Sequence, residues 1–359
     1  MDMNYNSIIP TILNHSPMAS TTIFISGATG YIAKHIIKIL LSKGYKVVGS
    51  VRSTEKGDAL KKQFNSENFT CEIVSSFTSP GAFDEALKKH PEVTVFLHTA
   101  SPVTLSAHDV EKDILIPAIQ GTKNAFSAIK KYGPQIEKVV LTSSYMAVTD
   151  VTEPVAHEIN EGSWNPITWE KALENPVNGY SGSKTFAEKA AWDFLKEESP
   201  KFTLAVIHPV YVFGPQAFDE DARGSLNLTA EMIGSILKLG PSDAVPQANG
   251  PFIDVRDVAK AHIVLFEKDF SGTRNLLYEG AFSLAGALGQ SRREFPQLQS
   301  TLPNVSAEEI EKYDSAAKTQ SNVLNNEATK KRLGFKFTSF EVSVSDSIKQ
   351  ILDANKQSK

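Results

Sequence analysis

The stretch TTIFISGATGYIAKHII, residues 21–37, joins a short apolar run to an amphipathic segment through two glycines three residues apart. A run of this length fits a buried strand, and the apolar spacing that follows is typical of a helix. Such a unit can hold a pyrophosphate, because glycine lets the backbone approach closely and the helix N-terminus attracts an anion. Alone, the pattern is equally compatible with a plain tight turn. The residues predicted to contact a dinucleotide in this loop are Gly27, Ala28, Thr29, Gly30, Tyr31 and Ile32.

The chain around this loop alternates apolar runs with helical patterns. The apolar runs are TIFIS, KVVGSV, EIV, VTVFLHTA, KVVLTSS and FTLAVIHP. The intervening helical patterns cover residues 31–42, 55–64, 82–90, 110–131 and 179–196. Strands that are apolar on both faces and are each followed by a helix require a parallel sheet covered on both sides. The sequence therefore predicts a doubly wound, Rossmann-type α/β domain, and at its first strand a cofactor loop is favoured over a plain turn.

This alternation ends near residue 214. Pro, Gly, Asn and Gln become frequent in GPSDAVPQANGP, and helical patterns at 225–239, 283–293 and 306–313 predict a smaller second lobe. The segment FIDVRDVAKAHIVLF, residues 252–266, is expected to be a strand and a helix that return to the first domain. We assign residues 1–20 to a flexible N-terminal tail, residues 21–156, 179–215 and 250–275 to the cofactor-binding Rossmann domain, and residues 157–178, 216–249 and 276–359 to a substrate-binding lobe.

The composition argues against several classes of function. The chain has 37 Lys and Arg against 41 Asp and Glu and no basic cluster, so neither nucleic acid nor a membrane surface is an expected partner. The first 20 residues lack Lys and Arg, unlike a secretory or mitochondrial leader. Cys71 is the only cysteine, so no intramolecular disulfide can form, which fits the reducing cytoplasm. The 8 histidines show no metal-ligand spacing, and we predict no metal.

The end of the second strand bears on the choice of cofactor. An NAD enzyme usually places a carboxylate there, about twenty residues after the glycines, on the ribose 2′-hydroxyl. The sequence VVGSVRSTEK has no acid between residues 47 and 54 and carries Arg52 instead, with Lys56 one helical turn beyond. A guanidinium with an ammonium suits a 2′-phosphate. The sequence therefore predicts NADPH, the alternative being that both cations are ordinary surface charges.

The helix predicted after the fifth strand carries the residues expected to perform the chemistry. In NGYSGSKTFAEKAAW, Tyr180 and Lys184 are four residues apart and share one helix face. The fifth strand ends in the hydroxyl-rich TSSY, and in this topology both segments reach the C-terminal edge of the sheet, beside the nicotinamide. A phenol has a pKa of about 10, which a nearby ammonium lowers. Tyr180 is thus the predicted proton donor, the alternative being a half-buried tyrosine beside a surface lysine.

Several stretches together carry a family resemblance. They are SGATGYIAKHI, VFLHTASPV, DILIPAIQGTKNAF, VVLTSSYMAV, SWNPITWEKALENPVNGYSGSKTFAEKAAW, HPVYVFGPQ, DVRDVAKAH and KKRLGFKF. From about residue 22 to 337 the chain resembles the extended short-chain dehydrogenases/reductases. Within them it is similar to the dihydroflavonol-reductase-like fungal NADPH-dependent carbonyl reductases, a group that includes methylglyoxal and 3-methylbutanal reductases.

The resemblance implies roles for individual residues. Ser144, the second serine of TSSY, would hydrogen-bond the substrate carbonyl, with Ser143 as the alternative. Tyr180 would donate the proton, and Lys184 would hold the ribose hydroxyls. Further cofactor contacts are implied at Ser76, Phe77, Thr99, Ala100, Pro209, Val212 through its backbone, and Thr229 from the second lobe. The substrate pocket would be lined by Val103, Tyr145, Thr149, Val177 and Tyr211.

Some positions depart from the family pattern. The third strand is followed by Ser75, Ser76 and Phe77 in place of the usual Asp and aliphatic residue, so adenine would be held through Ser76 without a charge. Val103 and Thr149 stand where Phe is usual, which predicts a wider pocket.

These features predict a reductase of aldehydes and ketones, located in the cytoplasm, in which hydride passes from NADPH to the carbonyl carbon and Tyr180 protonates the oxygen. The alternatives are a nucleotide-sugar epimerase or dehydratase, which Arg52 disfavours, and an NADPH-binding redox sensor without turnover, which the intact Ser144, Tyr180 and Lys184 disfavour. The physiological substrate, the stereochemistry of the alcohol, the presence of residues 1–17 in the mature protein and the oligomeric state stay open, a homodimer being one alternative.

Overall fold

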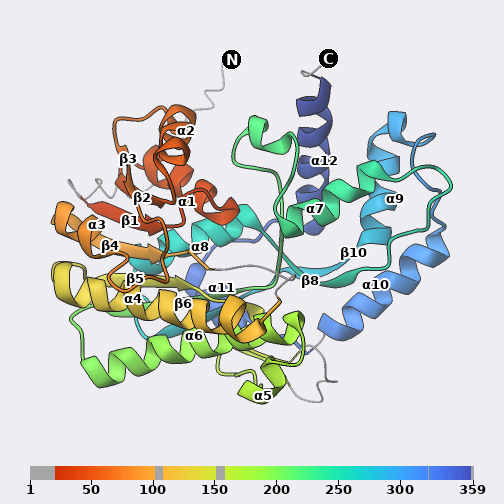
Figure 1. Ribbon diagram of the computed structural model, residues 1–359. Helices are drawn as coiled ribbons and strands as arrows, with labels where there is room; N and C mark the ends of the chain where they lie inside the picture. The colour runs from red at the N-terminus through yellow and green to blue at the C-terminus, as the bar shows by residue number, and fades with distance from the viewer. Residues whose placement is uncertain (1–20, 102–107, 151–157, 322, 357–359) are drawn as a thin grey trace, which may run out of the picture.

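One parallel sheet, with strands drawn from residues 22–277, organises the larger part of the structure (Figure 1). The computed structural model describes residues 21–101, 108–150, 158–321 and 323–356. Neighbouring strands of the sheet run parallel in the order β3-β2-β1-β4-β5-β6-β9, which confirms the predicted doubly wound α/β fold. The strands are β1 (Thr22–Ser26), β2 (Lys46–Val51), β3 (Phe69–Ile73), β4 (Val93–His98), β5 (Lys138–Thr142), β6 (Thr203–Pro209) and β9 (Thr273–Leu277).

Helices cover both faces of this sheet, as its apolar strands require. One buried core joins the sheet to α1 (Tyr31–Ser42), α2 (Thr54–Phe64) and α8 (Val255–Glu267). A second core joins the opposite face to α3 (Asp84–Lys89), α4 (Ile116–Tyr132) and α6 (Pro176–Glu198). A short π-helix, Glu111–Leu115, leads into α4.

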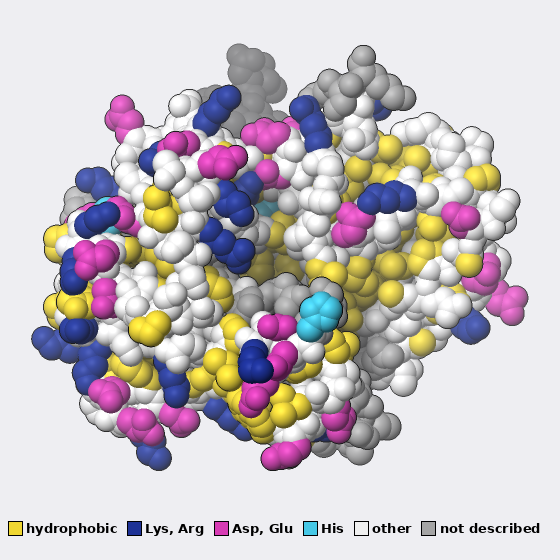
Figure 2. Space-filling model, viewed as in Figure 1, with side chains coloured by type: hydrophobic (Ala, Val, Ile, Leu, Met, Phe, Trp, Pro, Cys, Tyr) yellow, Lys and Arg dark blue, Asp and Glu magenta, His cyan; other side chains and the backbone are white. Residues whose placement is uncertain are grey.

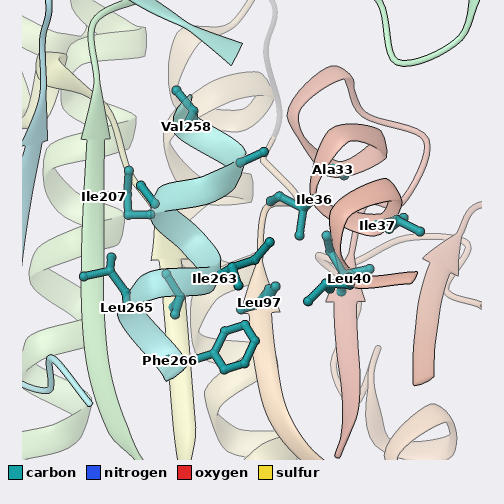
Figure 3. Packing of buried hydrophobic residues seen from close by; sticks show 14 of the residues in the cluster. Ala33, Ile36, Ile37, Leu40, Leu97, Ile207, Val258, Ile263, Leu265 and Phe266 are labelled. Atoms are coloured by element: carbon teal, nitrogen blue, oxygen red, sulfur yellow. The ribbon is translucent and has the colours of Figure 1, made fainter. Parts of the chain in front are cut away.

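In the first of these cores, the regularly spaced apolar residues of α1 and α8 pack against the sheet. Figure 3 shows Ile36 and Leu40 of α1 directed toward the strand residue Leu97, while Ile263 and Phe266 of α8 lie beside them. Residues four apart on a helix share one face, so the apolar spacing in the sequence becomes a continuous buried stripe. The side chains of these five residues are at most 5% exposed.

The strand order reverses between β1 and β4. β1 pairs with β2 on one side and with β4 on the other, and Ser26 at the end of β1 is in register with His98 at the end of β4. Loops that leave such neighbouring strands in opposite directions create a crevice at the carboxyl edge of the sheet, which is where doubly wound domains bind ligands. The functional site is therefore expected at this edge.

The remainder of the chain builds a second region against that edge, on the right in Figure 1. A small sheet in the order β10-β8-β7 packs a cluster of phenylalanines against four helices. Its strands are β7 (Tyr211–Phe213), β8 (Asn249–Asp254) and β10 (Gly280–Ser283), and its helices are α7 (Leu228–Gly234), α9 (Leu284–Glu294), α10 (Ala307–Ser321) and α12 (Phe340–Lys356). The short elements are α5 (Trp169–Ala172), α11 (Glu327–Leu333) and the 3-10 turns Tyr145–Ala147, Asp219–Ala222, Ser235–Lys238 and Pro296–Leu298.

Two features differ from the assignment of residues to domains. β8 was expected with the first sheet, but it pairs with β7 and β10 instead, and β9 supplies the last strand of the first sheet. α11 was expected with the second lobe, but Thr329 Oγ1 accepts a hydrogen bond from the Leu276 amide at 3.1 Å, and Leu333 lies in the first core. An apolar pattern identifies a strand or helix, but it carries no information on which sheet the element joins.

Gly49 in β2 provides a test of this packing. A Cβ on Gly49 would lie 2.7 Å from the Cβ of Ala28 and 3.1 Å from the Phe69 ring. Overpacking of this kind costs about 1–3 kcal/mol, so we expect Gly49→Ala to lower the melting temperature by several degrees. Gly280→Ala is the control, because no described atom lies within 4 Å of its Cβ position. Equal melting temperatures for the two variants would contradict this account.

Candidate active site

The loop after β1 requires glycine at its first position. Gly27 has φ +71°, and a Cβ there would lie 3.1 Å from the Cα of Ala100 in the loop after β4. The loop is held by hydrogen bonds from the Gly27 amide to Ser50 Oγ (3.0 Å) and from the Gly30 amide to the Gly27 carbonyl (2.9 Å). We call residues 27–30 the glycine loop.

The N-terminus of α1 follows the glycine loop and is open to an anion. Its N-cap, Gly30, offers no side-chain cap, and the first turn contains no acidic residue. The first-turn amides and the positive end of the helix dipole therefore suit the pyrophosphate of a dinucleotide. The Tyr31 hydroxyl is engaged elsewhere, because it donates to the Gly214 carbonyl at 2.6 Å. Tyr31 would thus contact a cofactor through its backbone.

Ser26 shapes the opposite wall of the crevice. Its Oγ accepts hydrogen bonds from the amides of Thr99 and Ala100, both at 3.0 Å, and its carbonyl accepts one from Thr99 Oγ1 at 2.5 Å. These bonds pin the start of the loop after β4 against the end of β1. The predicted cofactor residues Thr99 and Ala100 therefore face the glycine loop across a fixed gap.

Arg52 and Lys56 lie where a 2′-phosphate is predicted, beyond the end of β2 and in the first turn of α2. Both side chains are exposed, and within the described part of the chain neither has an ion-pair partner. Figure 2 shows a hollow between the two regions of the molecule, with hydrophobic side chains on its floor and Lys and Arg side chains along its left edge. Exposed cations without an ion-pair partner among the described residues, such as Arg52 and Lys56, are suited to an anionic ligand.

The loop after β3 holds the two residues predicted at the adenine. Ser76 Oγ lies 2.9 Å from Thr78 Oγ1, so its hydroxyl already has a neighbour. The Phe77 ring packs over Gly121 of α4, where a Cβ would lie 2.3 Å from the ring, and Asn124 Nδ2 donates to the Phe77 carbonyl at 3.1 Å. The Phe77 side chain thus anchors the loop to α4, and its contact with a cofactor stays a prediction.

Three residues predicted to act on the substrate lie close together. Ser144 follows β5 and caps the next turn, accepting a hydrogen bond from the Met146 amide at 3.2 Å. On α6, the Lys184 ammonium lies 5.7 Å from the centre of the Tyr180 ring and donates to Ser101 Oγ at 3.0 Å. Ser144 lies close enough to the Tyr180 phenol to influence its pKa. The fold therefore brings a phenol and an ammonium from α6 together with a hydroxyl from the end of β5.

Burial dominates the acid–base properties of this group. Burial raises the pKa of the Tyr180 phenol above its ordinary value, while the Ser144 hydroxyl lowers it. The sequence predicted that the ammonium of Lys184 would lower the pKa of Tyr180. In the structure burial is the largest influence and raises this pKa, and the Lys184 ammonium donates to Ser101 instead. Burial also lowers the pKa of Lys184 to about 8, against an opposing effect of Glu188. At neutral pH Tyr180 is protonated and able to donate.

The remaining predicted residues come from both regions of the chain. Pro209 ends β6, Val212 is buried in β7, and Thr229 is partly exposed in the first turn of α7. Among the pocket residues, Val177 and Tyr211 are 47% and 43% exposed, unusual for large apolar side chains. Tyr145 is partly buried, Thr149 is buried, and Val103 lies outside the described residues. Their contacts with ligands stay predictions.

Sequence reasoning missed two residues beside Lys184. Ser101 accepts its hydrogen bond, and Glu188 lies one helical turn further along α6. The spacing of Tyr180, Lys184 and Glu188 at four-residue intervals was the available indication, because such residues share a helix face. Among the described residues, no cluster of three or more His, Cys, Asp or Glu could hold a metal, and no helix could span a membrane.

Comparisons with known proteins agree with this geometry. Residues 23–279 match the model of the NAD dependent epimerase/dehydratase family. GRP2 from Candida albicans is 53% identical over 343 residues, which are 93% of this chain and 99% of GRP2. GRE2 from Saccharomyces cerevisiae, an NADPH-dependent methylglyoxal reductase, is 44% identical over 341 residues, 92% of this chain and 98% of GRE2. The crystal structure of yeast methylglyoxal/isovaleraldehyde reductase Gre2 complexed with NADPH has a TM-score of 0.87 at 42% identity, covering 94% of this chain and 100% of that one.

The buried Lys184 predicts a pH-dependent stability. Its pKa is about 8 in the fold against an ordinary 10.5, so between these pH values the unfolded chain binds more protons and stability rises with pH. Below pH 8 the cost of the buried charge is fully present. We therefore expect Lys184→Met to stabilise the protein by about 1–3 kcal/mol at pH 7, an advantage that shrinks as the pH rises.

Denaturant unfolding across this pH range measures the difference. Lys189→Met is the matched control, because Lys189 lies on the same helix with an exposed side chain. A stability difference for Lys184→Met that does not change with pH would contradict the burial of a charged Lys184.

Proposed function

The chain belongs to the NAD dependent epimerase/dehydratase family, and from this we propose that it reduces an aldehyde or ketone to the alcohol with NADPH. The observation that carries the proposal is the grouping of Tyr180, Ser144 and Lys184 at the carboxyl edge of the sheet. An acid, a hydroxyl and a cation at one point are what protonation of a developing alkoxide needs. The relative GRE2 is named as an NADPH-dependent methylglyoxal reductase, which supports the same reaction class.

The residues at the crevice fit NADPH. The glycine loop and the start of α1 would hold the pyrophosphate, and Arg52 with Lys56 would hold the 2′-phosphate. Lys184 would bind the ribose hydroxyls, exchanging its hydrogen bond to Ser101 for them. When bound, NADPH supplies the hydride that the carbonyl carbon accepts. The remaining contacts are proposed at Ser76, Phe77, Thr99, Ala100, Pro209, Val212 and Thr229.

The chain's own residues manage the proton. Tyr180, kept protonated by burial, donates its hydroxyl proton to the carbonyl oxygen as negative charge develops there. Ser144 lies near that phenol and would bind the same oxygen, which aligns the carbonyl for protonation. The Lys184 ammonium would stabilise the phenolate that Tyr180 becomes, because opposite charges attract strongly in a buried site.

Finer aspects of the function are also inferred. We propose small-molecule aldehydes and ketones as substrates, entering between Val177 and Tyr211, whose exposed apolar side chains suit such ligands. We infer a cytoplasmic location, which is supported by the single cysteine Cys71. A homodimer stays one alternative for the assembly.

Tyr180→Phe tests the proposed function. The change removes the phenolic proton and leaves the ring, so we expect turnover of NADPH with methylglyoxal to fall by a factor of about 100 or more while NADPH binding persists. Assays with small aldehydes, diketones and aryl ketones, together with a binding titration, measure both. Near-normal turnover of the variant would falsify the role of Tyr180. Wild-type protein that binds NADPH without consuming it on any carbonyl would instead indicate a redox sensor.

Arg52→Ala tests the choice of cofactor. Charge-assisted bonds to phosphate contribute roughly 1.5–3 kcal/mol, so we expect NADPH binding to weaken by about 10- to 150-fold and NADH binding to change little. Lys62→Ala is the control, because Lys62 is an exposed cation in the last turn of α2. Equal weakening of both cofactors in Arg52→Ala would show that Arg52 has a structural role only.

A further inference from the structure

A fully buried carboxylate lies one turn beyond Lys184 on α6. The Glu188 side chain is 0% exposed and is surrounded by hydrogen-bond donors. The donors are Ser143 Oγ (2.7 Å) and His208 Nε2 (2.6 Å) to Oε2, and Arg274 Nε (2.7 Å) and Trp192 Nε1 (3.3 Å) to Oε1. A buried carboxylate is tolerated only when it is paired in this way. Apart from Ser143, the alternative to Ser144 for the substrate carbonyl, neither Glu188 nor its partners has been given a role so far.

Three of the donors to Glu188 come from separate strand ends that meet at the site, and the fourth, Trp192, lies on α6. Ser143 immediately precedes Ser144 at the end of β5, and His208 immediately precedes Pro209 at the end of β6. Glu188 itself shares α6 with Tyr180 and Lys184. One carboxylate therefore ties the helix that carries the acid to the strand that carries its hydroxyl partner.

The end of β5 is fixed from its other face as well. Thr142 Oγ1 lies 2.7 Å from His262 Nε2 of α8, and His262 Nδ1 lies 2.8 Å from the Val258 carbonyl. Successive residues of a strand point to opposite faces, so Thr142 is held by α8 and Ser143 by α6. Ser144 therefore projects from a backbone that is anchored on both sides.

Arg274 supplies the charge that compensates Glu188, and it is itself held in place. Its guanidinium donates to the carbonyls of Glu161 (3.0 Å) and Ser163, and it lies 3.9 Å from the centre of the Trp164 ring. Its side chain is 10% exposed. Because these three contacts hold the planar guanidinium of Arg274 in place, its ion pair with Glu188 also fixes the position of the Glu188 carboxylate.

The same carboxylate acts on Lys184 through space. A small cavity between β4, β5, α4 and α6 is bordered by both Lys184 and Glu188, together with the polar side chains of Ser143, Ser101 and His98 and with apolar side chains such as Leu141. Burial lowers the pKa of His98 to about 3, so His98 is neutral at the site. Burial raises the pKa of Glu188, but His208 and Arg274 outweigh this and bring it to about 2. Glu188 is thus charged throughout the working range of the protein.

We propose that Glu188, held by Arg274, is a positioning residue of the reaction, which fixes Ser144 relative to Tyr180 and keeps Lys184 in its ammonium form. This inference rests on the proposed function, since it assumes that Tyr180 delivers a proton. The other ionisable groups facing Lys184 and Glu188 from the packed elements are Tyr180 on α6, His98 on β4, His208 on β6 and Arg274 on β9.

Charge substitutions with opposite expected effects test this proposal. Removing the negative charge in Glu188→Gln eases proton loss from Lys184 and Tyr180, so we expect the alkaline limb of the kcat profile to move down by about half a pH unit or more. Removing the positive charge in Arg274→Met is expected to move the limb upward. Arg274→Lys is the matched control, because it changes the fork geometry and keeps the charge, and its limb is expected to stay near that of the wild type.

A readout without turnover separates this proposal from the proposed function. Phenolate absorbance is titrated in each variant with and without an added Tyr180→Phe change, and the difference reports ionisation of Tyr180 alone. The pH midpoint of this difference is expected to shift in the same directions as the kcat profile. Wild-type protein without turnover would overturn the proposed function, whereas the absorbance titration would still test Glu188.

Each outcome of these titrations bears on Glu188. Opposite shifts for Glu188→Gln and Arg274→Met support the proposal, and shifts in the same direction, or none in variants that retain a cooperative melting transition, overturn it. If Glu188→Gln fails to fold, the comparison of Arg274→Met with Arg274→Lys decides: an upward shift in the first alone supports the proposal, and equal profiles overturn it.

Discussion

The reversal of strand order between β1 and β4 is the constraint on which the rest of the structure depends. Because the chain leaves these neighbouring strands in opposite directions, a crevice opens at the carboxyl edge of the sheet. Its base is narrow, since the positive φ of Gly27 lets the backbone of Ala100 approach closely. A dinucleotide held at this base would extend toward β5 and α6, which carry Ser144 and Tyr180. The proposed cofactor site and the proposed chemical site would then be continuous along this edge of the sheet.

Buried charge links the fold to the chemistry. A lysine whose pKa falls to about 8 through burial destabilises the folded chain, and such residues concentrate at functional sites. Here the cost is offset by a second buried charge, Glu188, which Arg274 neutralises in turn. The three residues alternate in sign and leave one net positive charge near Tyr180. Burial and Ser144 set the pKa of the free phenol, whereas this positive charge would stabilise the phenolate after proton transfer.

Features formed by residues close together in the sequence were predicted, whereas features formed by residues far apart in the sequence were missed. The glycine loop, Arg52 and the Tyr180–Lys184 pair are local patterns, so their spacing was enough to place them. Glu188 depends on His208 and Arg274, whose proximity only the assembled sheet creates. Likewise, the apolar pattern of β8 suits either sheet, and its pairing with β7 and β10 is decided by tertiary packing. The direction of the Tyr180 pKa was wrong for the same reason, because burial is a property of the whole fold.

The proposed reaction requires that hydride from NADPH is transferred to the carbonyl carbon and is retained in the alcohol product. Incubation of the purified protein with methylglyoxal and NADPH deuterated at the transferred position, followed by mass spectrometry of the alcohol, measures this most directly. The account predicts one deuterium bound to the former carbonyl carbon for each NADPH consumed. Alcohol without deuterium, or deuterium retained on a cofactor that is regenerated in each cycle as in an epimerase, would contradict it.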